Sequence, residues 1–467
     1  MSVERYDAIV IGAGLSGLAA GIRLAQFDRR VVVLERHALW GGLNSYYKLG
    51  GRRFDTGLHA LTNYVPAGTP GAPLTKVLRQ LRLRHADLEL GEQHHSEIRF
   101  PGLRLRFTND FALLEQQVAE RFPSQRDGFA RLVRDLRAMD GYAPSEGRQR
   151  AARGVLRDYL DDRLLVDALL LPICFYGSAR EDDVDWYQFV VLFRSLFLEG
   201  FARPQGGVKP LLDLLVRRYR SLGGELRLRT GVERVRVEGG RARGVVLADG
   251  TELASERVFS SAGWVETMRL CGPDESAARV AAGDFGVLSF VETILVLDRR
   301  PADFGYDAAI TFYNDAERFT WRRPDALIDP TSGVVCSPDN FDAARPPREG
   351  TMRLTVLADC ARWRQLGERE YAVAKREQAE RALDVAARHV ADPRPHEVFR
   401  DTFTPLTVQR FTGHVNGAVY GSPHKRLDGQ TGIENLFLTG TDQGLLGIVG
   451  ALMSGVLMAN RHALVAC

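Results

Sequence analysis

The sequence predicts an α/β protein organised around a dinucleotide-binding unit of the Rossmann type. Three observations support this fold class. Residues 6–11 are an apolar run of strand type, a glycine turn then opens into an alanine-rich helical segment, and a second strand-like run at residues 31–35 ends in an acidic side chain. A glycine turn alone occurs in many proteins, but strand, turn, helix, strand and terminal acid in this order are specific for a dinucleotide site.

The glycine turn has a separate physical requirement at each of its three glycines. Gly12 allows the tight turn, and Gly14 lets the backbone approach a pyrophosphate at the positive end of the following helix. Gly17 allows helix and strand to pack closely. Glu35 lies at about the spacing expected for the acid that accepts hydrogen bonds from the adenosine ribose. Because a carboxylate repels a 2′-phosphate, these residues favour FAD or NAD over NADP.

The composition is that of an ordinary globular chain with more than one domain. The 467 residues carry a net charge of +3, which gives no reason to expect nucleic acid as a partner. The five cysteines are scattered, so we expect neither a disulfide framework nor a metal site. A strand begins almost at the first residue, so we expect no signal peptide and a cytoplasmic protein. Residues 443–460 are apolar but glycine-rich and short, which predicts a buried helix rather than a membrane span.

Residues 76–200 have mostly helical periodicity, with apolar residues three and four apart over 113–133 and 155–171. Within this region, residues 186–201 are rich in aromatic side chains and apolar on more than one side. Two interpretations stay open for this segment: a core helix, or a surface that contacts a lipophilic substrate or a membrane. A nearby arginine cluster is either a solvated helix face or a patch for anionic lipid headgroups. It consists of Arg148, Arg150, Arg153, Arg157 and Arg163.

After residue 206 the chain returns to alternating helices and strands. The Asp249-Gly250 pair predicts the turn of a hairpin. A later strand ends in small residues such as Ala262, which suits close approach of a ligand. No repeat or low-complexity linker is present, so we expect the second domain to be inserted between pieces of the first. Helices are expected at 211–222 and 370–390, and strands at 225–228, 230–235, 243–251, 257–263 and 435–438, with mainly strands over 285–360.

Two loops and one histidine are candidate parts of the site. Gly41 and Gly42 follow the ribose-binding acid and predict a loop that passes close to the cofactor. His59 ends a strand-and-turn segment and is either a structural histidine or a group near the reactive ring of a flavin. Near the end of the chain, a Gly-x-Asp turn at Gly440 and Asp442 precedes a helix. The N-terminus of that helix would stabilise negative charge on a reduced flavin ring.

Several segments spread along the chain match one family. Besides the dinucleotide unit with Glu35, they are Gly41-Gly42, Phe54-Asp55-Thr56-Gly57-Leu58-His59, Gly206-Gly207, Gly223-Gly224-Glu225 with Val232, Thr404-Pro405-Leu406-Thr407 with Arg410-Phe411, residues 417–421 and residues 435–455. On these segments the chain resembles the flavin enzymes that include phytoene desaturases, carotenoid cis-trans isomerases and retinol saturases. This group is a branch of the amine oxidase-like flavoprotein superfamily.

The resemblance implies FAD as the cofactor and an α/β fold of the glutathione reductase-like architecture. A Rossmann-type FAD-binding domain would carry an inserted α+β substrate domain. The FAD-binding domain would comprise residues 1–75, 203–284 and 400–467. The substrate-binding domain would comprise 76–202 and 285–399, and its largely helical first part is the one that would contact a membrane.

The resemblance also implies which residues hold FAD. The three glycines of the first turn would hold the pyrophosphate, Glu35 the adenosine ribose, and the backbone of Val232 the adenine. Gly440 and Asp442 would bind the ribityl-pyrophosphate side, and the helix that follows would approach the flavin carbonyl edge. The full expected set is Gly12, Ala13, Gly14, Leu15, Ser16, Gly17, Glu35, Arg36, Gly41, Gly42, Leu43, Asn44, His59, Val232, Ala262, Gly440, Asp442, Gly447, Ile448 and Val449.

The implied activity is that of an FAD-dependent oxidoreductase acting on C–C or C=C bonds of a lipophilic isoprenoid or polyene, as a carotenoid desaturase, isomerase or saturase. His59 is the first candidate acid or base, and Glu292 and Gln443 are further candidates. Since one dinucleotide fingerprint is visible, we expect an external electron partner: a quinone, oxygen or a reductase. Two alternatives stay open, a flavin amine or amino-acid oxidase and a non-catalytic prenyl-lipid escort. Peripheral contact with the cytoplasmic membrane also stays open.

Overall fold

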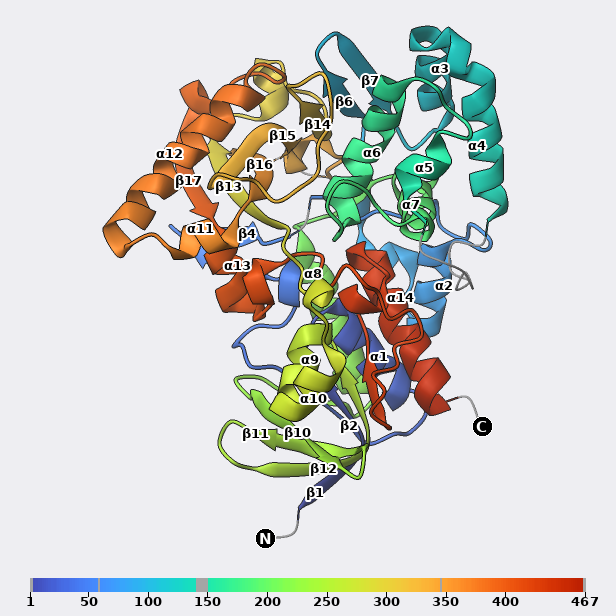
Figure 1. Cartoon of the computed structure of the whole chain (residues 1–467), viewed down its shortest axis with the longest axis vertical. Helices are drawn as coiled ribbons and strands as arrows, with labels where there is room; N and C mark the ends of the chain where they lie inside the picture. Colours follow the sequence, from blue (N-terminus) through green and yellow to red (C-terminus); the bar gives the residue numbers. More distant parts are fainter. Residues whose placement is uncertain (1–2, 58, 140–149, 345–346, 465–467) are drawn as a thin grey trace.

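The computed structural model describes residues 3–57, 59–139, 150–344 and 347–464, which fold into two lobes (Figure 1). Each lobe contains a sheet of seven strands. The lobe at the bottom of Figure 1 contains the start of the chain, and the lobe at the top contains the second sheet. Leu58 and Arg148, named above, lie outside the described residues, as does Cys467, one of the five cysteines.

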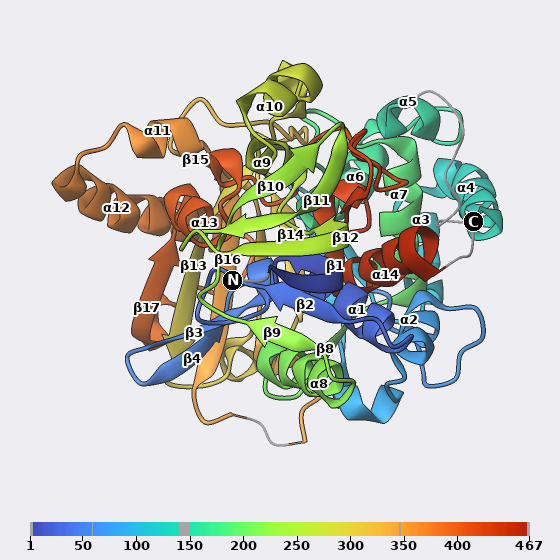
Figure 2. The ribbon, with the colours of Figure 1, turned by 90° about the horizontal axis from the view of Figure 1, so that it is seen from below.

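The first sheet is mainly parallel. Its strands follow the order β10-β11-β12-β1-β2-β9, with β18 paired to β12, and Figure 2 shows the central strands side by side. The strands β1, β2, β9, β12 and β18 are parallel, whereas β10 and β11 form an antiparallel extension. The bounds are β1 Glu4–Ile11, β2 Val31–Leu34, β9 Glu225–Arg227, β10 Val232–Glu238, β11 Arg241–Leu247, β12 Glu252–Ser260 and β18 Leu436–Leu438.

Helices cover both faces of this sheet, which explains why its central strands contain apolar runs without alternation, at residues 8–11 of β1 and along β2. Val10 and Val33 pack on one side among residues of α1, α8 and α14. Ile9 and Val32 pack on the other side, with residues of α9 such as Trp264. The helices of this lobe are α1 Leu15–Ala25, α2 Pro73–Leu81, α8 Val208–Ser221, α9 Trp264–Leu270, α10 Pro273–Arg279 and α14 Gly447–Ala459.

The second sheet is mostly antiparallel and follows the order β17-β13-β16-β15-β14-β6-β7. One face packs against α12, and the other turns toward the first lobe and the helical region. The last strand, β17, crosses the domain boundary expected between residues 399 and 400. The bounds are β6 Ser96–Phe100, β7 Leu103–Phe107, β13 Ser289–Leu297, β14 Ile310–Asn314, β15 Ile328–Cys336, β16 Gly350–Ala358, β17 Glu397–Phe403, α11 Cys360–Arg364, α12 Glu368–Ala386 and α13 Pro405–Thr412.

The expectation of mostly helix over residues 76–200 is wrong for the stretch that forms β6 and β7. This stretch is a hairpin in which apolar and polar residues alternate on either side of the Pro101-Gly102 turn, and Leu103, Leu105 and Phe107 are buried. Helices occupy most of the rest of the region, apart from β5, which pairs with β8 just after residue 200. A further short ladder joins β3 and β4, before the region begins. The bounds are α3 Ala112–Arg121, α4 Arg126–Ala138, α5 Ala152–Leu156, α6 Arg163–Gly177, α7 Trp186–Phe193, β3 Tyr46–Leu49, β4 Arg52–Asp55, β5 Leu90–Glu92 and β8 Ala202–Pro204.

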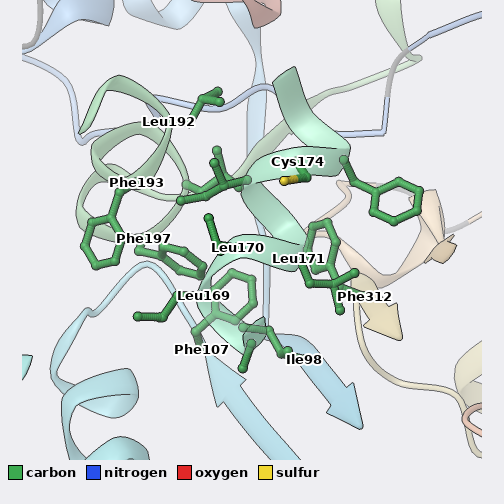
Figure 3. Close-up of a cluster of buried hydrophobic side chains, with 14 of the residues drawn as sticks. Ile98, Phe107, Leu169, Leu170, Leu171, Cys174, Leu192, Phe193, Phe197 and Phe312 are labelled. Atoms are coloured by element: carbon green, nitrogen blue, oxygen red, sulfur yellow. The ribbon is translucent and has the colours of Figure 1, made fainter. Parts of the chain in front are cut away.

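The aromatic segment 186–201 belongs largely to the protein core. Phe193 and Phe197 pack with Phe107 and with leucines of α6 (Figure 3). Val191 and Leu198 are partly exposed. A π-helix at Arg194–Glu199 continues α7. Packing against other side chains of the protein accounts for most of the apolar character of this segment.

The apolar stretch near the end of the chain forms α14, and most of its side chains are buried, as the sequence predicts. Across the four described ranges, no helix is both long and apolar enough to cross a membrane. Cys174, Cys271, Cys336 and Cys360 are buried free thiols. The described part of the chain also contains no cluster of three or more potential metal ligands.

Candidate active site

The glycine turn between β1 and α1 has the tight geometry that its sequence predicts. Gly12 has a φ of +94°, a conformation that favours glycine, and a Cβ there would lie 2.4 Å from Oγ of Ser261. A Cβ at Gly17 would lie 2.0 Å from the carbonyl oxygen of Gly12. Any side chain at Gly17 would therefore push α1 away from β1.

The middle glycine of the turn is different, because it borders open space. A Cβ at Gly14 would meet no atom within 4 Å, and a Cβ at Gly42 would meet only the Cα of Gly14, at 3.4 Å. Gly41 holds the second loop against the first by donating to the carbonyl oxygen of Ala13 at 2.8 Å. No side chain caps the start of α1. This bare backbone at a positive helix end fits the pyrophosphate of a dinucleotide.

The residues expected at the adenosine end lie close together. Oε2 of Glu35 accepts from the backbone N–H of Ala13, and Oε1 accepts from that of His37, both at 2.9 Å. These bonds leave lone pairs on a carboxylate that is 7% exposed. The Cβ of Arg36 would lie 3.6 Å from a Cβ at Gly231, next to Val232. The guanidinium of Arg36 is directed away from this region.

That guanidinium binds the end of α13 instead. It donates to the carbonyl oxygen of Phe411 at 3.2 Å and to that of Arg410 at 3.5 Å. A cation at the last turn of a helix satisfies carbonyl groups that have no partner within the helix. The structure therefore gives Arg36 a helix-capping contact, whereas its expected contact with FAD stays a prediction.

Other expected FAD-binding residues surround the glycine turn. Ala262 follows Ser261, whose hydroxyl donates to the carbonyl oxygen of Ile11 at 2.9 Å. Leu43 lies in the loop after Gly42, and its carbonyl oxygen accepts from the Thr56 hydroxyl at 2.8 Å. The rest of that loop, including Asn44, lies close to Gly57, because a Cβ at Gly57 would be 3.7 Å from the Asn44 side-chain oxygen. The loop therefore joins the glycine turn to the segment that carries His59.

The turn before α14 also reaches the glycine-turn region. A Cβ at Gly440 would lie 2.7 Å from Oγ of Ser16, near the start of α1. The α14 helix begins at Gly447 without a side-chain cap, and its backbone N–H groups point out from this end. A Cβ at Gly447 would lie 3.2 Å from Oγ1 of Thr62. The expected residues Gly447, Ile448 and Val449 therefore lie beside the loop that follows His59.

Asp442 is 2% exposed and its carboxylate is already hydrogen-bonded to backbone. Oδ2 accepts from the N–H of Trp264 at 2.6 Å, and Oδ1 accepts from that of Ser422 at 2.7 Å. The ammonium group of Lys425 lies 3.4 Å from Oδ1. In this structure Asp442 ties three segments together, and its expected contact with the ribityl side of FAD stays a prediction.

Two of the three candidate acid–base residues meet where the lobes face each other. Nε2 of His59 lies 3.6 Å from Oε2 of Glu292, and Oγ1 of Thr355 lies within hydrogen-bond distance of both, at 3.2 Å. The other carboxylate oxygen accepts from Nε of Arg353 at 2.5 Å. We call His59, Glu292, Arg353 and Thr355 the polar cluster.

Neighbouring strands position the polar cluster. Glu292 on β13 pairs with Thr355 on β16, and Ile294 pairs with Arg353 in the same ladder. Residues two apart on a strand share a face, so the carboxylate, guanidinium and hydroxyl all project toward the first lobe. Arg353 reaches that lobe directly, since it donates to the carbonyl oxygen of Thr56 at 2.6 Å.

Burial and charge set the protonation states of the polar cluster. Burial lowers the pKa of His59. The neighbouring Glu292 carboxylate raises this pKa by a smaller amount, so the imidazole is neutral at pH 7. Burial alone would raise the pKa of the Glu292 carboxyl, but the charge of Arg353 outweighs it and lowers the pKa. The cluster therefore contains one carboxylate and one guanidinium that compensate each other.

The sequence analysis identified His59 and Glu292 but missed Arg353, Thr355 and Arg203. Arg203 is 9% exposed, donates to the carbonyl oxygen of His59 at 2.9 Å and to Oδ2 of Asp55 at 2.6 Å, and so holds the histidine loop in place. A signal was present for Arg353, because a charged residue interrupts the otherwise apolar run of β16. Its partner could not be read from the sequence.

Gln443 lies away from the polar cluster. Its side chain is 4% exposed, and its amide donates to the carbonyl oxygen of Leu427 at 2.7 Å. The structure thus brings His59 and Glu292 together and gives Gln443 a separate structural contact. A catalytic role for any of the three stays a prediction.

The two lobes, the bare glycine loops and the uncapped helix ends define a dinucleotide-binding protein. The profile of the family described as "Flavin containing amine oxidoreductase" matches residues 15–461. The chain belongs to this family and is an FAD-dependent oxidoreductase. The expected fold class and cofactor are confirmed.

Several curated proteins are similar in sequence. Phytoene desaturase (neurosporene-forming) of Rhodobacter capsulatus is 29% identical over 55% of this chain and 52% of its own length, so the match spans about half of that relative. Prolycopene isomerase of Arabidopsis thaliana is 23% identical over 98% of this chain and 82% of its own. All-trans-retinol 13,14-reductase of Danio rerio is 24% identical over 98% and 87%.

Solved structures of low sequence identity share the fold. An oxidoreductase from Methanosarcina mazei has a TM-score of 0.66 at 18% identity, covering 96% of this chain and 98% of its own. Putrescine oxidase bound to putrescine has a TM-score of 0.61 at 15% identity, covering 97% and 98%. At this level of identity the likeness concerns the fold alone.

Proposed function

We propose that the protein acts on C–C or C=C bonds of a lipophilic isoprenoid or polyene, as a carotenoid desaturase, isomerase or saturase does. The observation that carries the proposal is an aromatic wall that continues the face of the polar cluster. Phe290 lies two residues before Glu292 on β13 and therefore on the same face. Its ring centroid lies 5.8 Å from that of Tyr420, 6.0 Å from Phe175 and 6.1 Å from Trp321.

The charge balance of the polar cluster supports an uncharged substrate. An amine substrate at neutral pH carries a positive charge that an enzyme must compensate with an anion or an aromatic cage. Glu292 is already compensated by Arg353, and the His59 ring is neutral. The cluster therefore has no spare negative charge for an ammonium group, which favours a polyene over an amine.

The polar cluster has the groups needed to hold and move one proton. FAD, when bound, supplies the redox chemistry by accepting or donating a hydride. The Thr355 hydroxyl donates to Glu292 and therefore accepts from the N–H at Nε2 of His59, 3.2 Å away, so the neutral imidazole can give a proton at Nε2 or take one at Nδ1. Phe175, Phe290 and Trp321 are at most 6% exposed and exclude water from one side of this region.

We also propose the electron partner and the location of the protein. One dinucleotide turn is visible in the sequence, so electrons would come from or go to a quinone, oxygen or a separate reductase. The protein would work in the cytoplasm, with peripheral contact to the cytoplasmic membrane that supplies a lipophilic substrate. The partly exposed apolar residues of the aromatic segment, Val191 and Leu198, are the first candidates for that contact.

The proposal is tested by anaerobic incubation of the FAD-loaded protein with a panel of carotenoid precursors. The flavin spectrum is recorded, and the extracted products are separated by chromatography. Bleaching of oxidised flavin together with a longer chromophore identifies a desaturase. Turnover that needs reduced flavin without net electron use identifies an isomerase, and loss of a double bond identifies a saturase.

Other outcomes of the same experiment contradict the proposal. Bleaching by primary amines with no response to any polyene would identify an amine oxidase. Tight binding of a prenyl lipid by a protein that carries FAD but turns over neither class would identify an escort. A flotation assay with liposomes tests the membrane contact separately, and quantitative recovery of the protein in the liposome-free fraction would rule that contact out.

A further inference from the structure

A second site lies at the opposite edge of the first sheet from the glycine turn. It is a surface pocket of about 320 Å³ lined by residues near the amino ends of β1 and β18 and by residues 254–257 of β12. Arg5 enters it from β1, and Asn435 enters it from the residue before β18. The complete lining is Arg5, Arg241, Ala242, Arg243, Ala254, Ser255, Glu256, Arg257 and Asn435.

Positive charge exceeds negative charge around this cavity. Of its four arginines, Arg241 forms an ion pair with Glu434, and Arg257 lies 3.9 Å from Glu256. The side chains of Arg5 and Arg243 are exposed and form no hydrogen bond or ion pair with any described residue, although the charge of Arg243 acts on Glu434. Guanidinium groups cannot lose their charge, so the four arginines exceed the two neighbouring carboxylates, Glu256 and Glu434, by about two positive charges at any physiological pH. Like charges around one cavity repel each other unless an anion binds between them.

Nearby acids do not cancel this excess. Glu4, the sequence neighbour of Arg5, is held by Arg227 at 2.7 Å and Arg30 at 3.0 Å, outside the cavity. Glu252, at the start of β12, is held by Arg236 at 3.0 Å. Every carboxylate close to the cavity is therefore paired, whereas two of its guanidinium groups are not.

This cavity is distinct from the FAD site. Nucleotides bind at the carboxyl ends of parallel strands, where β1 leads into Gly12. Arg5 lies seven residues earlier on the same strand, which at ~3.3 Å per residue separates the two places by about 23 Å. The excess charge cannot serve the pyrophosphate of FAD.

We propose that this cavity binds a small anion that carries phosphate groups. The planar guanidinium donates paired N–H groups that match phosphate oxygens, and the side-chain amide of Asn435 adds a further donor at the same place. A diphosphate carries two or more negative charges, which matches the excess of the lining. The volume equals about ten water molecules of ~30 Å³ each, which is enough for a diphosphate.

The test is calorimetric titration of the full-length, FAD-loaded protein with sodium pyrophosphate at low ionic strength. Loading with FAD keeps pyrophosphate out of the cofactor site. The natural protein should bind one equivalent, and Arg5→Gln combined with Arg243→Gln should weaken binding by about tenfold or more, because two charge-assisted donors are lost. Arg376→Gln, on the exposed side of α12, is the matched control and should leave binding unchanged. FAD content should be equal in all three proteins.

A second arm identifies the source of the phosphate. The same proteins are floated with vesicles of phosphatidylcholine, with and without phosphatidylglycerol. Arginine-dependent binding of pyrophosphate supports a free phosphate ligand, and arginine-dependent flotation with phosphatidylglycerol alone supports a lipid headgroup at the same cavity. Absence of both interactions, or binding that the double variant retains in full, would overturn the proposal.

Discussion

Nε of Arg353 donates to Oε1 of Glu292 at 2.5 Å, and the two side chains are only 2% and 5% exposed. The pair joins adjacent strands of the second sheet, and Arg353 extends to the backbone of the first lobe at Thr56. A buried ion pair of this kind is retained because removing one partner leaves the other charge without compensation. Here the pair also sets the charge seen by His59, so stability and site chemistry are coupled.

Glu292→Gln should strongly destabilise the protein. The substitution leaves Arg353 buried without a counter-charge, which costs about 3–5 kcal/mol in comparable pairs. Urea unfolding followed by circular dichroism, with and without FAD, measures the change. Glu349→Gln removes the partner of Arg52 in a much more exposed pair and is the matched control, with little change expected. Equal effects of the two variants would show that Glu292 and Arg353 are not coupled as described.

His59→Ala should lower turnover of a polyene substrate by about 10²-fold if His59 transfers a proton. The FAD absorbance should persist, because the glycine loops that are expected to hold the pyrophosphate are unchanged. His94→Gln, at a histidine whose side chain is 62% exposed, is the control and should retain activity. Full turnover by His59→Ala with FAD bound would remove His59 from the mechanism.

Stability should depend on pH through His414 and Glu266. Burial alone would lower the pKa of His414, but the hydrogen bond and charge of Glu266 outweigh burial and raise it. A raised folded-state pKa means that the stabilising contribution is complete below about pH 6.5 and is lost as the pH rises through the folded value.

His414→Gln should therefore destabilise the protein more at pH 5.5 than at pH 8.5. Thermal unfolding of the natural protein and of the variant across this pH range measures the difference. Comparing the two proteins isolates the contribution of His414 from that of His59, whose lowered pKa makes stability change with pH in the opposite direction. A difference between variant and natural protein that stays constant with pH would contradict the assignment.

Gly14→Ala and Gly17→Ala should fail in different ways. Gly14 has a φ of −70° and open space at its Cβ position, so alanine fits the apoprotein but intrudes where the pyrophosphate would lie. We expect normal folding and FAD binding weakened on the order of tenfold. At Gly17 the Cβ would lie 2.0 Å from a backbone oxygen, so unfolding free energy should fall by about 1–3 kcal/mol or more.

Fluorescence titration of the apoproteins with FAD, paired with urea unfolding, separates these two outcomes. Gly154→Ala, at an exposed helical glycine with no atom near its Cβ, is the matched control and should change neither FAD affinity nor stability by a comparable amount. Unchanged FAD affinity in Gly14→Ala would mean that the pyrophosphate does not approach that backbone.

The sequence alone predicted the FAD-binding frame because its signals are local. The glycine turn, the two apolar strands around it, the terminal acid and the last buried helix each lie within a short stretch, where periodicity and glycine geometry are enough. The same local reasoning missed the β6–β7 hairpin, although alternation around Pro101-Gly102 was present, because long helical patterns on either side dominated the region.

The polar cluster was decided by tertiary structure. His59 and Thr355 are separated by 296 residues, and Glu292 and Arg353 by 61, so only the register of β13 with β16 and the docking of the lobes bring them together. The same holds for contacts that compete with expected roles, such as Arg36 at the end of α13 and Asp442 between two backbone N–H groups. Sequence specifies which groups are available, and packing decides which partner each one meets, because burial selects the arrangement that leaves no charge uncompensated.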